Sequence, residues 1–163
     1  YIPVDAKNLR AEGFQIQRDL NVMGTVKMLE AVIPGMVARN SGRIAVVSSV
    51  SGYRGLRTAA AYGATKAALI NMCEALRMEL RDVGVTVQLV NPGFIKTPLT
   101  AKNEFPMPFL MPVENAVDQF YRGLLTDRFE ITFPKRFTWI LKFMRLLPYA
   151  LYLPLIDRTT RAD

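Results

Sequence analysis

The sequence of 163 residues contains no histidine and a single cysteine. The absence of histidine excludes catalytic triads that use an imidazole base, and with one cysteine it argues against a zinc site, so no metal is expected. A lone cysteine forms no internal disulfide, which is typical of a reducing compartment and predicts a cytoplasmic protein. Because unpaired cysteines are usually buried, we expect Cys73 to be a small core residue and not a nucleophile.

The tail has no long apolar run, and the whole sequence has no block of basic residues. A membrane-spanning helix needs about 20 predominantly apolar residues, whereas residues 135–156 are interrupted by Lys142, Arg145, Pro148 and Pro154. The net charge of +7 is not gathered in a Lys/Arg run of about five to eight residues, so we expect no nucleic-acid partner. An anionic membrane surface or a phosphate-bearing cofactor remains a suitable partner for a basic protein.

The rest of the sequence is organised around residues 43–66, RIAVVSSVSGYRGLRTAAAYGATK. The apolar run 44–47 is short and rich in β-branched residues, so it predicts a buried strand. Ser49 follows this strand at its carboxyl end, where α/β sheets place their ligands. A helix is predicted from about residue 59 to residue 83, and Tyr62 and Lys66, four residues apart, lie on one face of it.

Tyr62 and Lys66 together suggest proton transfer. An ammonium group beside a phenol favours the phenolate and lowers the phenol's pKa from its reference value of about 10. A tyrosine tuned in this way can exchange a proton with a substrate hydroxyl or carbonyl while Ser49 holds the same oxygen. The chemistry suits carbonyl reduction or alcohol oxidation, although a YxxxK pair taken alone is a weak signal.

The remaining segments continue an α/β pattern. Apolar residues at helical spacing predict a long helix from about residue 14 to residue 38, in which Pro34 marks a kink or a break. Gly42 is expected to end this helix in a left-handed conformation. Further predicted elements are a strand at 85–90, a helix from 113 to about 125 and a short strand at 129–133. Arg54 and Arg57, in the loop before Tyr62, are expected to be solvated charges or to meet an acidic substrate.

Several motifs now occur together. Ser48 and Ser49 end a strand, Tyr62 lies 13 residues beyond Ser49 and four before Lys66, and Asn91-Pro92-Gly93 ends the next strand. With these spacings the chain resembles the short-chain dehydrogenase/reductase family, from about residue 5 to residue 97 and more loosely to residue 134. The resemblance implies an α/β fold with a Rossmann-like doubly wound parallel sheet and an NAD- or NADP-dependent oxidoreductase.

The resemblance also implies roles for individual residues. Tyr62 is the general acid/base, Lys66 supports it and holds the nicotinamide ribose, and Ser49 positions the reacting oxygen. Asn21, 28 residues before Ser49, matches an asparagine whose backbone carbonyl holds a proton-relay water, although on composition alone it would be a solvent-facing helix residue. The residues implied to contact the nicotinamide and the pyrophosphate after the second strand are Pro92, Gly93, Ile95 and Thr97.

The strand, Gly-rich turn and helix that hold the pyrophosphate in this architecture are not found in the sequence. We therefore expect a C-terminal portion of the fold, with a partial catalytic domain at residues 1–134 and an added tail at residues 135–163. Such a chain should bind cofactor poorly by itself, and its first strand should lie at an unpaired sheet edge. The segment that chooses between NAD and NADP is absent. The alternative is a short, non-catalytic form that serves as an oligomerisation or membrane-associated module.

Residues 98–112 are rich in proline and occupy the place of the family's variable substrate lid. Phe105, Met107 and Phe109, with Phe94 just before this segment, would form an adaptable apolar wall. This interpretation predicts a small hydrophobic carbonyl or alcohol substrate. A proline-rich linker packed on the core explains the composition equally well.

The tail and the helix after residue 59 offer two contact surfaces. Residues 135–163 contain six basic and two acidic residues, and helical spacing places Thr138, Lys142, Arg145 and Tyr149 in one polar stripe. A basic amphipathic helix through 135–156 can lie on an anionic membrane surface, dock on a partner subunit or cover the substrate pocket. The predicted helix from about residue 59 carries a face rich in alanine, which contains Ala60, Ala61, Ala64, Ala67 and Ala68. This face suits packing on the sheet or, as the resemblance implies, contacts in a homodimer or homotetramer.

Overall fold

The computed structural model describes residues 7, 9–98, 100–102 and 106–160. Its strands are β1 (Gly42–Val47), β2 (Val85–Pro92) and β3 (Glu130–Phe133). The α-helices are α1 (Ala11–Arg18), α2 (Gly24–Ala38), α3 (Ala60–Glu79), α4 (Val113–Leu124), α5 (Lys135–Arg145) and α6 (Tyr149–Thr160). A π-helical turn, η2 (Asp19–Met23), joins α1 to α2, and short 3₁₀ turns are η3 (Val50–Gly52), η4 (Arg81–Val83) and η5 (Thr100–Lys102).

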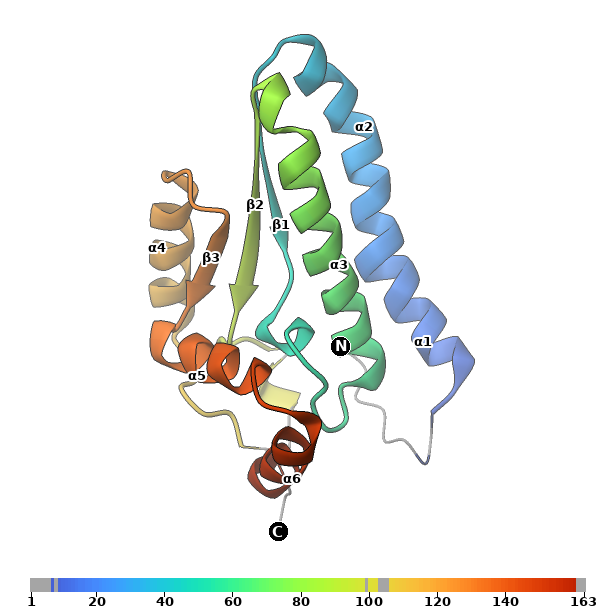
Figure 1. The fold of residues 1–163 in the computed structure, drawn as a ribbon, viewed down its shortest axis with the longest axis vertical. Helices are drawn as coiled ribbons and strands as arrows, with labels where there is room; N and C mark the ends of the chain where they lie inside the picture. The colour runs from blue at the N-terminus through green and yellow to red at the C-terminus, as the bar shows by residue number, and fades with distance from the viewer. Residues whose placement is uncertain (1–6, 8, 99, 103–105, 161–163) are drawn as a thin grey trace.

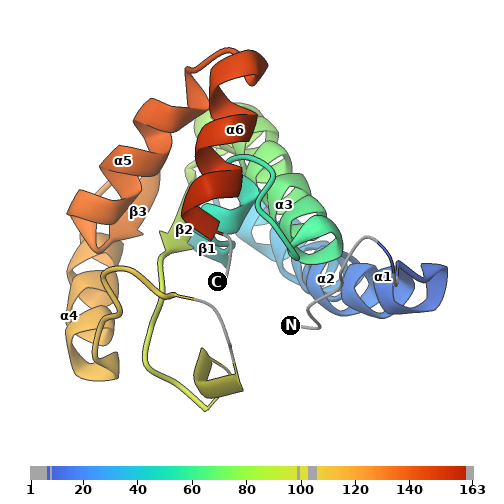
Figure 2. The same cartoon turned by 90° about the horizontal axis from the view of Figure 1, so that it is seen from below.

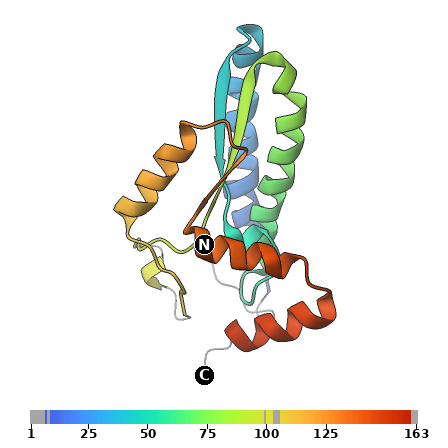
Figure 3. The ribbon, with the colours of Figure 1, turned by 60° about the vertical axis from the view of Figure 1, so that its left-hand side comes forward.

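The three strands form a parallel sheet in the order β1-β2-β3 (Figure 1). Helices α2 and α3 cover one face and α4 covers the other, so the molecule has three layers (Figure 3). Central strand β2 is buried along almost its whole length, as a parallel sheet with helices on both faces requires. The structure confirms the predicted α/β class and the parallel sheet.

Strand β1 differs from β2 because only one of its faces is covered. Ile44 and Val46 are buried, whereas Arg43, Ala45 and Val47 are exposed. Among the described residues β1 pairs with β2 alone. The predicted unpaired edge at the first strand is therefore confirmed for the part of the chain that the structure describes.

The predicted helix 14–38 is confirmed, and Pro34 lies inside α2 without ending it. The prediction for Gly42 was wrong. Asn40 takes the left-handed conformation (φ 51°), which asparagine tolerates, and Gly42 begins β1. A side chain at Gly42 would collide with Met36, whose Sδ lies 2.5 Å from the position of a Cβ. This glycine is therefore required by close packing.

The continuous helix Ala11–Ala38 is long and apolar enough to cross a membrane on length and composition alone. One such helix near the start of a chain is weak evidence, because core helices of soluble proteins meet the same criterion. Here the α2 half packs through Leu29 against the core beside β1, and Asn21 bonds to α3. We therefore treat the helix as part of the α/β body.

Helix α3 buries a stripe that includes Leu69 and Cys73, which are 1% and 0% exposed. The cysteine is a core residue, as predicted, and burial raises the pKa of its thiol to about 12. Of the alanine-rich face only Ala61 is buried; Ala60, Ala64, Ala67 and Ala68 are exposed. Packing of that face on the sheet is excluded, and its other predicted use, in a subunit interface, remains a prediction.

The tail forms two helices, α5 and α6, at the carboxyl ends of the strands (Figure 2). Only part of the predicted polar stripe faces the protein, because its members Arg145 and Tyr149 are exposed. Thr138 is 1% exposed, and Lys142 forms an ion pair with Glu130 of β3. Trp139 and Phe143 point the other way and are 68% and 67% exposed.

Candidate active site

The loop that leaves β1 packs directly on the first turns of α3. Ser48 Oγ donates to the Lys66 carbonyl oxygen at 2.8 Å. A Cβ on Gly52 would lie 2.7 Å from the Lys66 carbonyl carbon, and a Cβ on Gly63 would lie 3.0 Å from the Ser51 oxygen. Two glycines thus permit close approach of loop and helix. This approach brings Ser49, Tyr62 and Lys66 to the carboxyl end of the sheet.

Ser49 is half-buried and extended, just after β1. Its Oγ accepts a hydrogen bond from the Ser51 backbone N–H at 3.1 Å and so caps the 3₁₀ turn η3. The cap fixes the side-chain oxygen through its lone pair. The hydroxyl hydrogen can still be donated to an oxygen that approaches from the carboxyl end of the sheet.

Tyr62 and Lys66 lie on one face of α3, as predicted. The Lys66 ammonium is 5.6 Å from the centroid of the Tyr62 ring and donates to the carbonyl oxygen of Val47, the last residue of β1, at 3.1 Å. Burial lowers the pKa of Lys66 below its ordinary value of 10.5. The structure therefore holds a half-buried cation between the tyrosine and the end of β1.

Asn21 lies in the π-helical turn η2, which the sequence did not predict. Its Nδ2 donates to Thr65 Oγ1 at 3.0 Å, and Thr65 Oγ1 donates to the Tyr62 carbonyl oxygen at 2.8 Å. The Asn21 carbonyl oxygen accepts from Thr25 Oγ1 at 2.7 Å. π-Helical turns are frequent at functional sites, and this one ties Asn21 to the turn that presents Tyr62.

The segment 92–97 follows β2 and contacts β3, α5 and Met111. A Cβ on Gly93 would lie 2.9 Å from Phe137 Cδ1, so packing of α5 gives this position a reason to be glycine. Ile95 forms an isolated bridge with Met111. Thr97 Oγ1 lies 3.3 Å from Thr100 Oγ1. Pro92 is the last residue of β2.

The predicted substrate lid is anchored on α5. The rings of Phe94 and Phe109 each stack on Phe137, with centroids 5.7 Å apart in both pairs. Met107 is half-buried and Phe109 is 47% exposed, while Phe105 lies outside the described residues. Phe137 was not predicted as part of this wall, since its only sequence signal was an aromatic residue in an amphipathic helix.

Tyr53, in the loop that follows β1, belongs to a cluster that was not predicted from the sequence. Glu130 accepts from Tyr53 Oη at 2.5 Å and from Asn91 Nδ2 at 2.8 Å, and it pairs with Lys142. Burial alone would raise the pKa of Glu130, but hydrogen bonds from Lys142, Tyr53 and Asn91 outweigh burial and lower it. Burial and the Glu130 carboxylate raise the pKa of Tyr53. A carboxylate that opens an otherwise apolar strand was the available signal.

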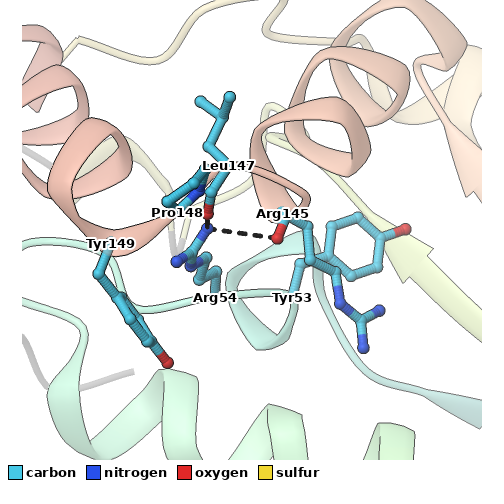
Figure 4. Close-up of a pocket in the computed structure, with 6 residues that line it drawn as sticks. All are labelled: Tyr53, Arg54, Arg145, Leu147, Pro148 and Tyr149. Atoms are coloured by element: carbon cyan, nitrogen blue, oxygen red, sulfur yellow. Dashed lines mark hydrogen bonds between the residues drawn. The ribbon is translucent and has the colours of Figure 1, made fainter.

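Arg54 and Arg57, in the loop between β1 and α3, bind residues of the tail. They are therefore not the solvated loop charges that the sequence suggested. Arg54 Nη1 donates to carbonyl oxygens at the end of α5, including those of Arg145 (3.2 Å) and Leu147 (2.6 Å), beside a pocket of about 340 Å³ (Figure 4). Its guanidinium also stacks over the rings of Tyr149 and Tyr152, at 4.6 and 4.0 Å. Arg57 pairs with Asp157 of α6 at 2.5 Å.

Comparison with known proteins gives a consistent family. Residues 2–106 match the family model described as short chain dehydrogenase. An uncharacterized oxidoreductase of Myxococcus xanthus is 42% identical over 157 residues, which is 96% of this chain and 60% of that protein. The estradiol 17-beta-dehydrogenase 1 of Rattus norvegicus is 41% identical over 102 residues, 63% of this chain and 29% of that protein.

Solved structures agree. A short chain dehydrogenase from Burkholderia cenocepacia, in complex with NADP, has a TM-score of 0.79 and 28% identity, covering 93% of this chain and 62% of that one. A short-chain dehydrogenase from Sphingobium yanoikuyae, in complex with NADPH, has a TM-score of 0.74 and 25% identity, covering 90% of this chain and 62% of that one. The chain thus spans about three fifths of the length of the Myxococcus protein and of these two structures.

Proposed function

This chain belongs to the short-chain dehydrogenase family, and from that premise we propose that it supplies the catalytic residues of an NAD- or NADP-dependent oxidoreductase. The reaction passes a hydride between the nicotinamide and a hydrophobic carbonyl or alcohol. The observation that carries the proposal is the placement of the Lys66 ammonium 5.6 Å from the Tyr62 ring, at the same sheet edge as Ser49.

Each side chain has a defined role in the proposed reaction. The Ser49 hydroxyl donates to the substrate oxygen and holds it beside Tyr62. The Tyr62 hydroxyl gives its proton to that oxygen during reduction and takes it back during oxidation. The Lys66 ammonium stabilises the negative charge that develops on the phenol oxygen. Asn21 holds the first turn of α3 through Thr65, and its carbonyl oxygen is the proposed partner of a relay water.

The residues present fit the nicotinamide end of the cofactor. The Lys66 donors and the Tyr62 hydroxyl lie at the carboxyl end of β1, where a ribose with two hydroxyls can be bound, and the backbone of Pro92, Gly93 and Ile95 and the Thr97 hydroxyl follow β2 at the same edge. When bound, the cofactor supplies or accepts the hydride. NADP and NADPH occur in the two similar structures, which supports a nicotinamide cofactor without choosing between NAD and NADP.

A hydrophobic substrate follows from the wall beside the site. Phe94 and Phe109 each stack on Phe137, and Met107 is a flexible apolar side chain in the same segment. We propose small hydrophobic ketones and the matching secondary alcohols as the substrate class.

The helix α1–α2 with α3 is proposed to form a homodimer or homotetramer contact, because Leu20 and Met28 are 73% and 67% exposed beside the exposed alanines of α3.

The replacement Tyr62→Phe in the complete natural polypeptide tests the catalytic proposal. With the hydroxyl removed, kcat/KM for a hydrophobic ketone should fall by about 10²–10⁴-fold, the range of general acid–base catalysis. Oxidation of NADH or NADPH, followed by absorbance, measures the loss, and circular dichroism checks the fold. Tyr121→Phe is the matched control, since Tyr121 is 60% exposed on α4. Near-normal turnover by Tyr62→Phe would refute the assignment.

A further inference from the structure

Helices α5 and α6 lie at the carboxyl end of the sheet (Figure 2). Along α5 and its last turn, Trp139, Ile140, Phe143 and Leu146 recur every three or four residues and so lie on one side of the helix; we call these residues the outer face of the tail. Their side chains are between 48% and 80% exposed. Single exposed apolar residues are ordinary, but a contiguous group of them marks an interaction surface.

The orientation of the two helices is fixed by contacts on their inner sides. In α5, Phe137 and Thr138 are buried and Lys142 pairs with Glu130. In α6, Tyr152 and Ile156 are 2% and 9% exposed, and Tyr152 Oη donates to the Gly55 carbonyl oxygen at 2.8 Å. The outer face is therefore held outward by specific bonds, and it cannot turn inward without breaking them.

The charge of this region is positive. Asp157, the only acid among the described residues 135–160, pairs with Arg57. The exposed cations of the two helices are Lys135, Arg136, Arg145 and Arg158. Arg136 precedes Trp139, Ile140 and Phe143 by three, four and seven residues, which places it on the same side of α5. Burial and the nearby Arg128 and Lys142 charges lower the pKa of Lys135, as expected in a positive field.

We propose that the outer face of the tail binds an anionic lipid surface. Tryptophan and tyrosine side chains prefer the headgroup level of a bilayer, and amphipathic helices with basic residues lie in the plane of the interface. The exposed cations would meet lipid phosphates while Ile140, Phe143 and Leu146 enter the acyl boundary. This contact does not require the proposed catalysis.

Two other occupants fit the observations less well. Additional parallel strands would join the sheet at β1, whereas α5 packs on β3 at the opposite edge. A second copy that met this face across a two-fold axis would bring the same patch onto itself. The cations of one copy would then face those of the other, without an exposed acid in the described tail to neutralise them.

Flotation with lipid vesicles tests the proposal on the complete natural polypeptide. We expect it to float with vesicles of phosphatidylcholine and phosphatidylglycerol, to stay behind with phosphatidylcholine alone, and to dissociate as salt rises. The triple variant Trp139→Ser/Phe143→Ser/Leu146→Ser should lose about tenfold or more in partitioning. Leu125→Ser is the matched control, since Leu125 is 68% exposed at the end of α4.

A second variant keeps the test decisive if the triple variant folds poorly. Arg136→Gln/Arg158→Gln changes no apolar contact and should weaken binding to anionic vesicles by about tenfold. Absence of flotation, or equal binding to neutral and anionic vesicles, would overturn the proposal. A change from dimer to monomer in sedimentation velocity, caused by the triple variant without vesicles, would identify a second copy as the occupant and also overturn it. Turnover of a water-soluble ketone should be unchanged in all three variants, so failure of catalysis is read separately.

Discussion

Strand β2 carries two amide side chains that are 0% exposed, Gln88 and Asn91. Gln88 Oε1 accepts from Arg43 at 3.1 Å, and its Nε2 lies within 3.2 Å of three backbone carbonyl oxygens of the turn between α4 and β3. Asn91 donates to Glu130 at 2.8 Å, but its Oδ1 has no hydrogen-bond partner among the residues that the structure describes.

The two amides show how polar groups are used at the two ends of the sheet. At Gln88 both the donor and the acceptor capacity are consumed, and the result is a closed turn. At the carboxyl end, Ser49 and Lys66 are held by single bonds from or to the backbone, and capacity is left over. Because buried polar groups normally find partners, the unused capacity at one end indicates where a ligand is expected, and the saturated end indicates structure.

Lys66→Met should show the largest effect at the open end. Loss of the ammonium should reduce kcat/KM in the complete polypeptide by about 10²-fold or more, since the phenolate of Tyr62 loses its cation. Stability should not fall. Burial lowers the pKa of Lys66 in the folded state. Below this lowered pKa, the buried charge reduces the free energy of unfolding. The reduction disappears as the pH rises toward the ordinary lysine pKa.

The measurements are steady-state kinetics and urea unfolding at pH 7. Lys27→Met, on the exposed side of α2, is the control and should change neither. A Lys66→Met variant that keeps its turnover, or one that unfolds far more easily, would mean that Lys66 is a structural residue like Gln88, and the contrast between the two ends would be broken.

Gln88→Leu tests the saturated end. The leucine leaves Arg43 and the carbonyls of the turn without their partner, which should lower the free energy of unfolding by about 2–4 kcal/mol. Urea unfolding measures this loss. Turnover per folded molecule should stay the same, because the amide lies away from Tyr62 on the strand. A fall in kcat without a fall in stability would contradict the structural role.

Glu130→Gln tests the cluster that Glu130 forms with Tyr53, Asn91 and Lys142. Hydrogen bonds from Lys142, Tyr53 and Asn91 outweigh the effect of burial and lower the pKa of Glu130. The carboxylate therefore stabilises the fold fully above the ordinary glutamate pKa of 4.5. This stabilisation is lost as the pH falls through the lowered pKa. At pH 7 the variant should unfold about 1–2 kcal/mol more easily. The difference from the parent protein should shrink toward pH 3, as followed by thermal melts across that range. A constant difference would assign the loss to packing.

The elements could be predicted because their signals are local. Residues 85–92 and 60–79 follow the periods of a strand and a helix, and their observed bounds differ from expectation by a few residues. The π-helical turn at 19–23 gave no such signal. It is tied to α3 by the Asn21–Thr65 bond, which joins residues 44 apart in the sequence. The left-handed conformation fell on Asn40 and not on the glycine that the pattern indicated.

The site shows the same limit. The positions of Ser49, Tyr62 and Lys66 follow from one strand, one loop and one helix that are consecutive in the chain. The Glu130 cluster and the stack on Phe137 combine distant segments, and no short pattern marks them. In α5 the periodicity revealed two faces but not which one is inside. Thr138 and Lys142 face inward because Thr132 and Glu130 of β3 offer them partners, and Phe137 is buried beside them in the core.

Arg57→Gln should have the smallest effect. It removes the ion pair with Asp157, whose side chains are 49% and 38% exposed, and exposed pairs contribute about 0–1 kcal/mol. The free energy of global unfolding should therefore barely change. Amide exchange in α6 should become faster, because the pair is one of the bonds between this helix and the loop that joins β1 to α3. Arg122→Gln breaks an equally ordinary exposed pair within α4 and is the control. Quickened exchange in α6 alone would show that the tail and the open end of the sheet are joined by bonds that do little for the fold as a whole. Equal exchange in both variants would mean that Arg54 and Tyr152 hold α6 without help from Arg57.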